Sequence, residues 1–179
     1  MSTLIYHEKQ SWQLCAVHSL NNFLQRKRFQ QSDLDEICLS LTQRKWFNPH
    51  RSYLGIGNYD VNVIIRAFAL CNYECIWWDS RKDISLINFS KVDGFLFNRE
   101  VWMNLFGFMT VPWKSNHWYI CKYLHGSYYN LDSNNYSPLC IGAEEDFKEF
   151  ILSQKECTLR FHILLVLSPE TLSDESWKK

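Results

Sequence analysis

Cys15 is the residue in this chain whose type and position most suggest chemistry, because it opens a helical pattern that runs from Leu14 to Gln25. A helix N-terminus presents unpaired N–H groups and positive partial charge, which make a thiol placed there more acidic. The thiolate, not the thiol, is the nucleophile. Most cysteines are inert buried residues, and taken alone Cys15 would more often be one of them. Whether other residues of the chain could activate the Cys15 thiol determines which of these two interpretations holds.

His117 and Asp132 are the candidate partners, and a predicted hairpin brings them together. Two strand-like runs, 117–124 and 127–132, are joined by His125-Gly126, which is a typical hairpin turn. Each residue also has an ordinary interpretation. His117 could be a half-buried strand histidine, and Asp132 could simply form a turn.

The register of this hairpin determines which side chains meet. With the turn centred on His125-Gly126, His117 faces Asn134, and Asp132 faces Tyr119. A turn centred one residue later keeps the same parity, so His117, Asp132 and Asn134 share one face of the sheet in either register. Diagonal neighbours lie roughly 7–8 Å apart, within reach of a carboxylate–imidazole hydrogen bond that would orient the ring.

Gln10 precedes Cys15 by five residues and could donate its amide to a developing oxyanion, beside the backbone N–H of Cys15. The spacing alone fits an exposed polar loop residue better. His18, one helical turn after Cys15, is interpreted as a structural hydrogen-bonding residue. Cys71 and Cys75 have no second matched pair, so neither a zinc site nor any other metal site is expected. No motif indicates a cofactor.

Composition narrows the class of protein. The 179 residues are 46% hydrophobic and 21% charged, which fits one globular domain; we assign it to residues 1–168, followed by a loose tail at 169–179. Lys+Arg and Asp+Glu balance at 19 each, so nucleic acid is not an expected partner. No apolar run is long enough to span a bilayer. Seven cysteines without an export signal predict reduced thiols in the cytoplasm, or also at the nucleus or a membrane periphery. We expect a monomer.

The elements that would position these residues follow from periodicity and turn signals. Helical patterns come first and strand patterns later, which predicts an α+β fold in which N-terminal helices pack on a mostly antiparallel sheet. The predicted helices are 14–25, 32–43 with Ser32 as N-cap, 59–70 and 144–154; the predicted strands are 74–79, 94–98, 117–124, 127–132 and 159–167.

Longer motifs around these residues resemble the Josephin domain, and the short Josephin proteins in particular. The resemblance runs from Ile5 to about Ser168 and rests on residues 5–10, 14–22, 48–52, 57–64, 77–79, 117–118 and 128–133. It implies a papain-like cysteine protease fold and deubiquitinase activity. It also implies that Cys15 is the nucleophile, His117 the base and acid, Asp132 the residue that orients His117, and Gln10 the oxyanion donor.

The resemblance further implies that ubiquitin and ubiquitin-conjugated proteins are the partners. The ubiquitin-binding surface of ataxin-type relatives maps partly onto Phe29, Val61 and Asn62, while Cys71 stands where those relatives have an aromatic residue. The C-terminal Gly-Gly of ubiquitin needs a narrow cleft, and Trp12 and Trp118 are candidates for its walls.

Three other functions remain open from the sequence. The first is a ubiquitin-binding module with weak or no hydrolysis, because filled catalytic positions do not guarantee alignment. The second is another thiol hydrolase or acyltransferase. The third is a redox-sensing thiol protein, which would need a resolving cysteine near Cys15.

Overall fold

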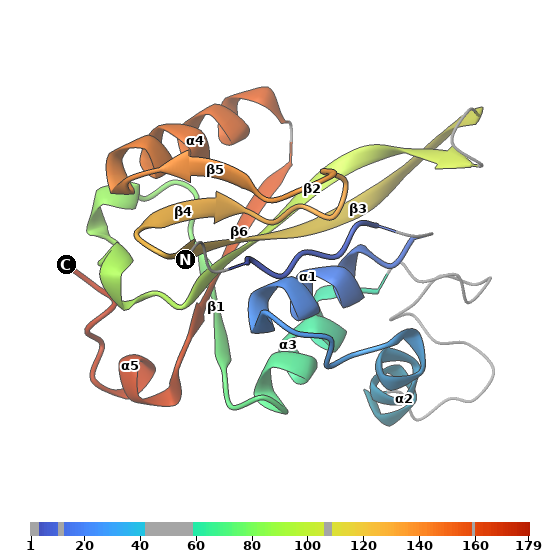
Figure 1. Cartoon of the computed structure of the whole chain (residues 1–179), viewed down its shortest axis with the longest axis horizontal. Helices are drawn as coiled ribbons and strands as arrows, with labels where there is room; N and C mark the ends of the chain where they lie inside the picture. The colour runs from blue at the N-terminus through green and yellow to red at the C-terminus, as the bar shows by residue number, and fades with distance from the viewer. Residues whose placement is uncertain (1–3, 11–12, 42–58, 106–108, 159) are drawn as a thin grey trace.

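The computed structural model describes residues 4–10, 13–41, 59–105, 109–158 and 160–179. Within these ranges one antiparallel sheet has the strand order β1-β6-β2-β3-β4-β5 (Figure 1). The helices are α1 (Cys15–Leu24), α2 (Gln31–Leu41), α3 (Val61–Ala69), α4 (Glu144–Cys157) and α5 (Pro169–Ser173). The strands are β1 (Glu74–Trp78), β2 (Gly94–Leu105), β3 (Met109–Leu124), β4 (Ser127–Asn130), β5 (Leu139–Gly142) and β6 (Phe161–Leu167). The predicted α+β class is confirmed.

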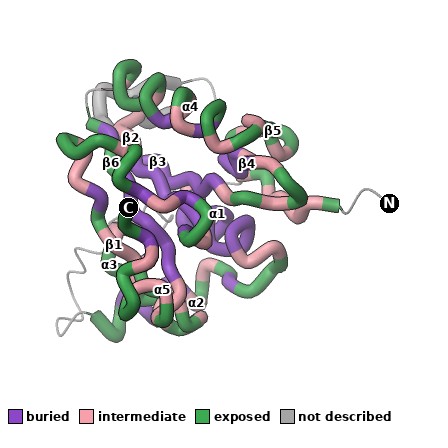
Figure 2. Tube along the Cα trace, turned by 90° about the vertical axis from the view of Figure 1, so that its left-hand side faces the viewer, coloured by how far each residue is buried: buried purple, intermediate pink, exposed green. Residues whose placement is uncertain are grey.

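Both faces of the sheet are covered, because alternate residues of its central strands belong to two separate cores. On β6, Leu164 and Val166 pack with the helices α1, α2 and α3, whereas Ile163 and Leu165 pack with α4 and the C-terminal segment. Figure 2 shows the buried positions gathered along the central strands and α1. The apolar run that predicted a strand near 159–167 is therefore an interior strand buried on both sides.

Helix α1 is the central helix of the first core, with every residue from Cys15 to Phe23 buried. Gln25 ends it in the left-handed conformation, and Lys122 donates to the Phe23 carbonyl at 2.8 Å. The start of β2 lies so close that a Cβ on Gly94 would be 2.8 Å from two ring carbons of Phe23. These contacts hold the helix against the sheet and so fix the position of Cys15.

Strands β2 and β3 are longer than predicted. Their pairing with the rest of the sheet stops at Arg99 on β2 and at Cys121 on β3, and beyond these points they pair with each other as a two-stranded ribbon (Figure 1). The sequence did not reveal this ribbon, because Asn98-Arg99-Glu100 interrupts the apolar alternation and Pro112 lies in the second strand. Proline is tolerated in such a strand because it pairs on one side only.

The prediction of a loose C-terminal segment is wrong. Ser168 caps α5, and Trp177 is only 8% exposed, with its ring edge-to-face with Trp78 at 6.4 Å. The backbone N–H of Lys179 donates to the Leu86 carbonyl. Two smaller differences also concern local elements. Strand β5 was not predicted, and α2 begins at Gln31, one residue before the predicted N-cap.

Candidate active site

His117 and Asp132 form a buried hydrogen-bonded pair at 2.7 Å between Nε2 and Oδ1. The two residues are 3% and 4% exposed, respectively. The hairpin turn is centred on His125-Gly126, both with positive φ, and Cys121 pairs with Asn130. The first of the two predicted registers is therefore confirmed, and its parity brings the imidazole and the carboxylate together.

Asp132 is placed by a turn rather than by the strand itself. Strand β4 ends at Asn130, two residues earlier than predicted, and the Asn130 side chain accepts from the Asp132 N–H at 2.9 Å. The Asp132 side chain in turn accepts from the Asn134 N–H at 2.9 Å. The side chain of Asn134 also lies 3.0 Å from His117 Nε2. This local network fixes the carboxylate in front of the ring.

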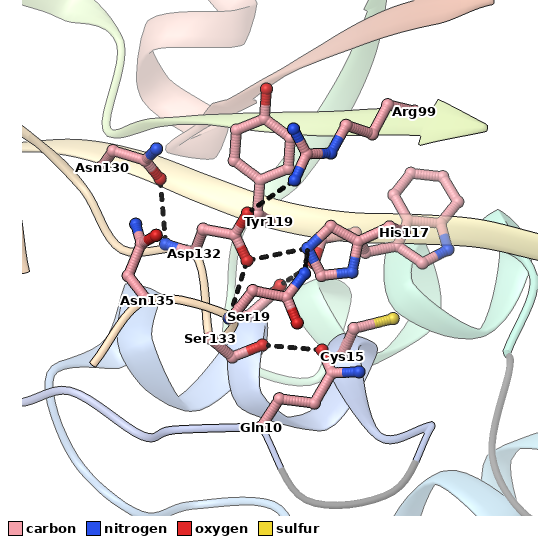
Figure 3. Close-up of polar contacts among 12 residues, drawn as sticks. Gln10, Cys15, Ser19, Arg99, His117, Tyr119, Asn130, Asp132, Ser133 and Asn135 are labelled. Atoms are coloured by element: carbon pink, nitrogen blue, oxygen red, sulfur yellow. Dashed lines mark hydrogen bonds and ion pairs between the residues drawn. The ribbon is translucent and has the colours of Figure 1, made fainter. Parts of the chain in front are cut away.

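Cys15 is the first residue of α1 and is 4% exposed. Its N-cap, Leu14, makes no side-chain hydrogen bond to the first turn, so Cys15 stands at a helix N-terminus that its N-cap side chain does not cap. Cys15 Sγ lies 4.0 Å from the carbonyl of Asn116, the residue before His117. Figure 3 shows Cys15 reaching the site from the helix and His117 from the sheet, with the ring nitrogen not bonded to Asp132 on the side of Cys15.

His117 and Asp132 each shift the pKa of the other toward the charged form. Burial would lower the pKa of His117, but the hydrogen bond with Asp132, together with Cys15, raises it to about 9. Burial would raise the pKa of Asp132, but the net effect is a lowered pKa. The causes are the hydrogen bond to His117, the charge of the His117 ring, the hydrogen bond from the Asn134 N–H and the charge of Arg99. The raised pKa favours the imidazolium form of His117, and the Asp132 carboxylate faces that charge.

Gln10 is held beside Cys15 by Ser133. The Gln10 N–H donates to the Ser133 carbonyl at 2.6 Å, and the Ser133 hydroxyl donates to Gln10 Oε1 at 3.1 Å. Figure 3 shows the Gln10 amide lying next to Cys15. Because its oxygen is bound by Ser133, the amide is oriented through a residue for which the sequence had indicated no role.

The N-terminal segment that carries Gln10 is fixed to α1 by a polar cluster around Glu8. The Glu8 carboxylate lies 2.6 Å from His18 Nδ1 and accepts from Tyr6 Oη at 2.5 Å and Asn21 Nδ2 at 3.0 Å. Asn22 accepts from the Glu8 N–H at 2.6 Å and donates to the Leu131 carbonyl at 2.9 Å. The structural interpretation of His18 is confirmed, and the cluster joins three segments that contribute to the site.

Arg99 is a further residue of the site that the sequence did not indicate. Its Nη2 lies 3.2 Å from Asp132 Oδ2, and it faces His117 across the β2–β3 pair. The sequence feature that could have revealed Arg99 is its position opposite the candidate histidine on the neighbouring strand. That position is evident only once β2 is known to extend past Asn98.

The proposed ubiquitin-contacting residues are dispersed. Phe29 and Trp118 lie in the first core, and Trp118 Nε1 donates to the Tyr59 carbonyl at 3.1 Å, so their burial does not support the predicted contact role. Asn62 is exposed and Val61 half-buried at the start of α3. Trp12 lies outside the described residues. Within those residues no cluster of three His, Cys, Asp or Glu side chains could hold a metal ion, and no helix is long and apolar enough to cross a membrane.

A thiol at a helix N-terminus, an imidazole and a carboxylate that orients it are the parts of a thiol-dependent hydrolase of the papain type. Comparisons with known proteins identify the family. The family model described as Josephin matches residues 10–166. The chain belongs to the Josephin family.

Individual relatives agree with this assignment. A Josephin-like protein of Drosophila melanogaster is 44% identical over 93% of this chain and 75% of its own length. Human Josephin-2 is 40% identical over 97% of this chain and 91% of its own length. The similarity to a solved structure, Trichinella spiralis UCH37 bound to ubiquitin vinyl methyl ester, is lower, with a TM-score of 0.43 and 12% identity over 58% of this chain and 76% of that one.

Proposed function

We propose that this chain is a deubiquitinase that hydrolyses the bond after the C-terminal glycine of ubiquitin through a thioester on Cys15. The observation that supports this most directly is the buried His117–Asp132 pair beside a cysteine at the start of α1. Membership of the Josephin family supports ubiquitin as the substrate. Ubiquitin and ubiquitin-conjugated proteins are the proposed partners.

In the first half of the reaction the Cys15 thiolate attacks the glycine carbonyl. The Gln10 amide and the backbone N–H of Cys15 donate to the oxyanion that forms, which is where such donors contribute most. The His117 imidazolium protonates the leaving lysine amine, so the tetrahedral intermediate collapses to a thioester. Asp132 keeps the ring oriented and stabilises its positive charge throughout.

In the second half water replaces the amine. Neutral His117 removes a proton from the water as it attacks the thioester, and the Cys15 thiolate leaves. The ring is then an imidazolium again beside a thiolate, which restores the starting state. The proposed reaction steps therefore use only side chains, backbone N–H groups and water, and none of them requires a metal ion or a cofactor.

A ubiquitin vinyl sulfone probe tests the proposal, because it forms a covalent adduct only with a thiol that is both reactive and reached by ubiquitin. We expect one adduct, at Cys15, that is lost in Cys15→Ala and retained in Cys140→Ala. Cys140 is a matched control because it is an exposed free thiol on β5. Release of a fluorophore from the ubiquitin C-terminus should follow the same pattern.

The main alternative is a ubiquitin-binding module without hydrolysis. Measurable ubiquitin binding with no adduct and no fluorophore release would favour that alternative. Turnover of a small thioester but not of any ubiquitin conjugate would instead indicate a thiol hydrolase of other specificity.

A further inference from the structure

The two carboxylate oxygens of Asp132 have different partners. Oδ1 lies 2.7 Å from His117 Nε2 and accepts from the Asn134 N–H at 2.9 Å. Oδ2 is bound by the Arg99 guanidinium, with Nη2 at 3.2 Å. Because the two oxygens belong to one rigid plane, the position of Oδ2 determines the direction in which Oδ1 points. The partner of Oδ2 therefore acts on the orientation of His117 through Asp132.

The Tyr119 ring contacts both Arg99 and His117. The guanidinium of Arg99 lies over the Tyr119 ring at 5.3 Å, and the His117 ring stacks on the same ring at 5.9 Å with an interplanar angle of 19°. The Tyr119 side chain is buried, and its hydroxyl donates to Gln154 of α4 at 3.3 Å. Figure 3 shows the Arg99 guanidinium beside the Tyr119 ring and the His117 ring beside the Asp132 carboxylate. An aromatic ring attracts a cation that lies over its face, so the Tyr119 ring favours the observed position of the Arg99 guanidinium.

The inward position of the Arg99 side chain is not explained by hydrogen bonding of its Nε or by a lack of access to solvent. Its side chain is 29% exposed and could turn to solvent, yet within the described part of the chain its buried Nε has no hydrogen-bond partner. A buried donor without a partner is unfavourable, so another contact must hold the side chain inward. The ion pair with Asp132 and the contact with the Tyr119 ring are two contacts that do so, and only the first reaches the proposed site.

We propose that Arg99 is a positioning residue that holds the Asp132 carboxylate in line with His117, and that the reactivity of Cys15 depends on this orientation of the His117 ring. The proposal deepens the proposed function by adding a residue to its site, but it needs only a reactive Cys15 and not ubiquitin as substrate. Arg99 touches neither the nucleophile nor the reacting carbonyl in this arrangement, and its effect passes through Asp132.

The experiment measures alkylation of Cys15 by iodoacetamide at about pH 6, below the ordinary thiol pKa, where only a stabilised thiolate reacts quickly. Because the chain has seven cysteines, the modified peptide is identified by mass. Arg99→Met should slow Cys15 alkylation about tenfold, the size expected for residues coupled in one polar network. It should lower kcat for the ubiquitin–fluorophore substrate by a similar factor, with little change in KM. Arg99→Lys should retain more of both rates than Arg99→Met.

The same substitution in an Asp132→Asn background separates positioning from general damage. There Arg99→Met should change the alkylation rate by less than about twofold, because the carboxylate through which it acts is gone. Equal slowing in both backgrounds, or no slowing with Asp132 present, would overturn the proposal. If Arg99→Met does not fold, as judged by thermal unfolding, Arg99→Lys is compared across the two backgrounds instead.

Arg160→Met is the matched control. It removes the same charge just before β6, where Arg160 is largely exposed and lies 3.9 Å from Glu100, and it should leave Cys15 alkylation unchanged. The alkylation assay contains no ubiquitin. A protein that shows the Arg99–Asp132 coupling but never cleaves ubiquitin would therefore refute the proposed function and leave this inference standing.

Discussion

Ser133 and Gln10 bind each other through two reciprocal hydrogen bonds, one from the Gln10 backbone to the Ser133 carbonyl at 2.6 Å and one from the Ser133 hydroxyl to Gln10 Oε1 at 3.1 Å. The loop that carries the orienting carboxylate thus also orients the amide proposed for the oxyanion. Substitution of either side chain should change the rate of the chemical step, because both act on the geometry of that step.

Gln10→Ala should reduce kcat about a hundredfold, the usual loss for one oxyanion donor. Ser133→Ala should reduce kcat by a smaller factor, roughly tenfold, because the amide remains but is no longer oriented by the hydroxyl. Initial rates over a range of ubiquitin–fluorophore concentrations separate kcat from KM. Ser173→Ala, in an exposed position on α5, serves as the control. If Ser133→Ala matched the control while Gln10→Ala did not, the orienting role of Ser133 would be wrong.

Asp132→Asn should shift the alkaline limb of the kcat/KM profile to lower pH. Asp132 helps to raise the pKa of His117 to about 9, so replacing the carboxylate by an amide lowers that pKa. The imidazolium is the proposed proton donor, and it is then lost at a lower pH. An amide can still orient the ring, so we expect the maximal rate to fall only roughly tenfold, less than for loss of the general acid itself. An alkaline limb at the same pH as in the wild type would contradict this assignment.

Glu8→Ala should destabilise the fold and should do so in a pH-dependent way. Burial raises the pKa of Glu8, but hydrogen bonds from His18, Tyr6 and Asn21 lower it below its usual value. A carboxyl group with a lowered folded-state pKa stabilises the protein above its unfolded pKa, and this contribution is lost as pH falls through the folded value. We expect a loss of about 2 kcal/mol near neutral pH, typical of hydrogen bonds to a charged group.

Urea unfolding at several pH values measures this effect, and the gap between Glu8→Ala and the wild type should narrow as the pH falls below about 4. Glu145→Ala is the matched control, because Glu145 forms an exposed helical pair with Lys148 that should contribute less than about 1 kcal/mol. A Glu8 variant no less stable than the Glu145 variant would show that the cluster does not fix the N-terminal segment.

Local signals allowed prediction of the hairpin and of the pair that His117 forms with Asp132. His125-Gly126 defines the turn, and the side-chain alternation then determines that His117 and Asp132 lie on one face. Cys15 was evident for the same reason, since the helix start is encoded within a few residues of it. In each case the information lies in one short segment of the chain.

Contacts between distant segments could not be predicted in this way. Arg99 reaches Asp132 only because β2 pairs with β3 beyond the apolar part of either strand. Alternation also placed Trp118 on the face opposite His117 without showing that its indole packs in the core between α1 and the sheet, so the predicted contact role of Trp118 stays a prediction that its burial does not support. Alternation along a strand assigns residues to faces, but it does not say which face a helix will cover.

The C-terminal segment provides the last prediction. Trp177 is 8% exposed and packs in the core on the α4 face, where its ring meets that of Trp78. Trp177→Ala should lower the free energy of unfolding by about 3 kcal/mol, the low end for loss of a buried aromatic side chain, because the segment can partly close the cavity. Rates per folded molecule should not change, since the residue belongs to the core away from α1. Tyr136→Ala, at an 86% exposed aromatic residue, should alter stability by less than about 0.5 kcal/mol. Equal urea midpoints for the two variants would show that the segment after Ser168 is as loose as the sequence had indicated.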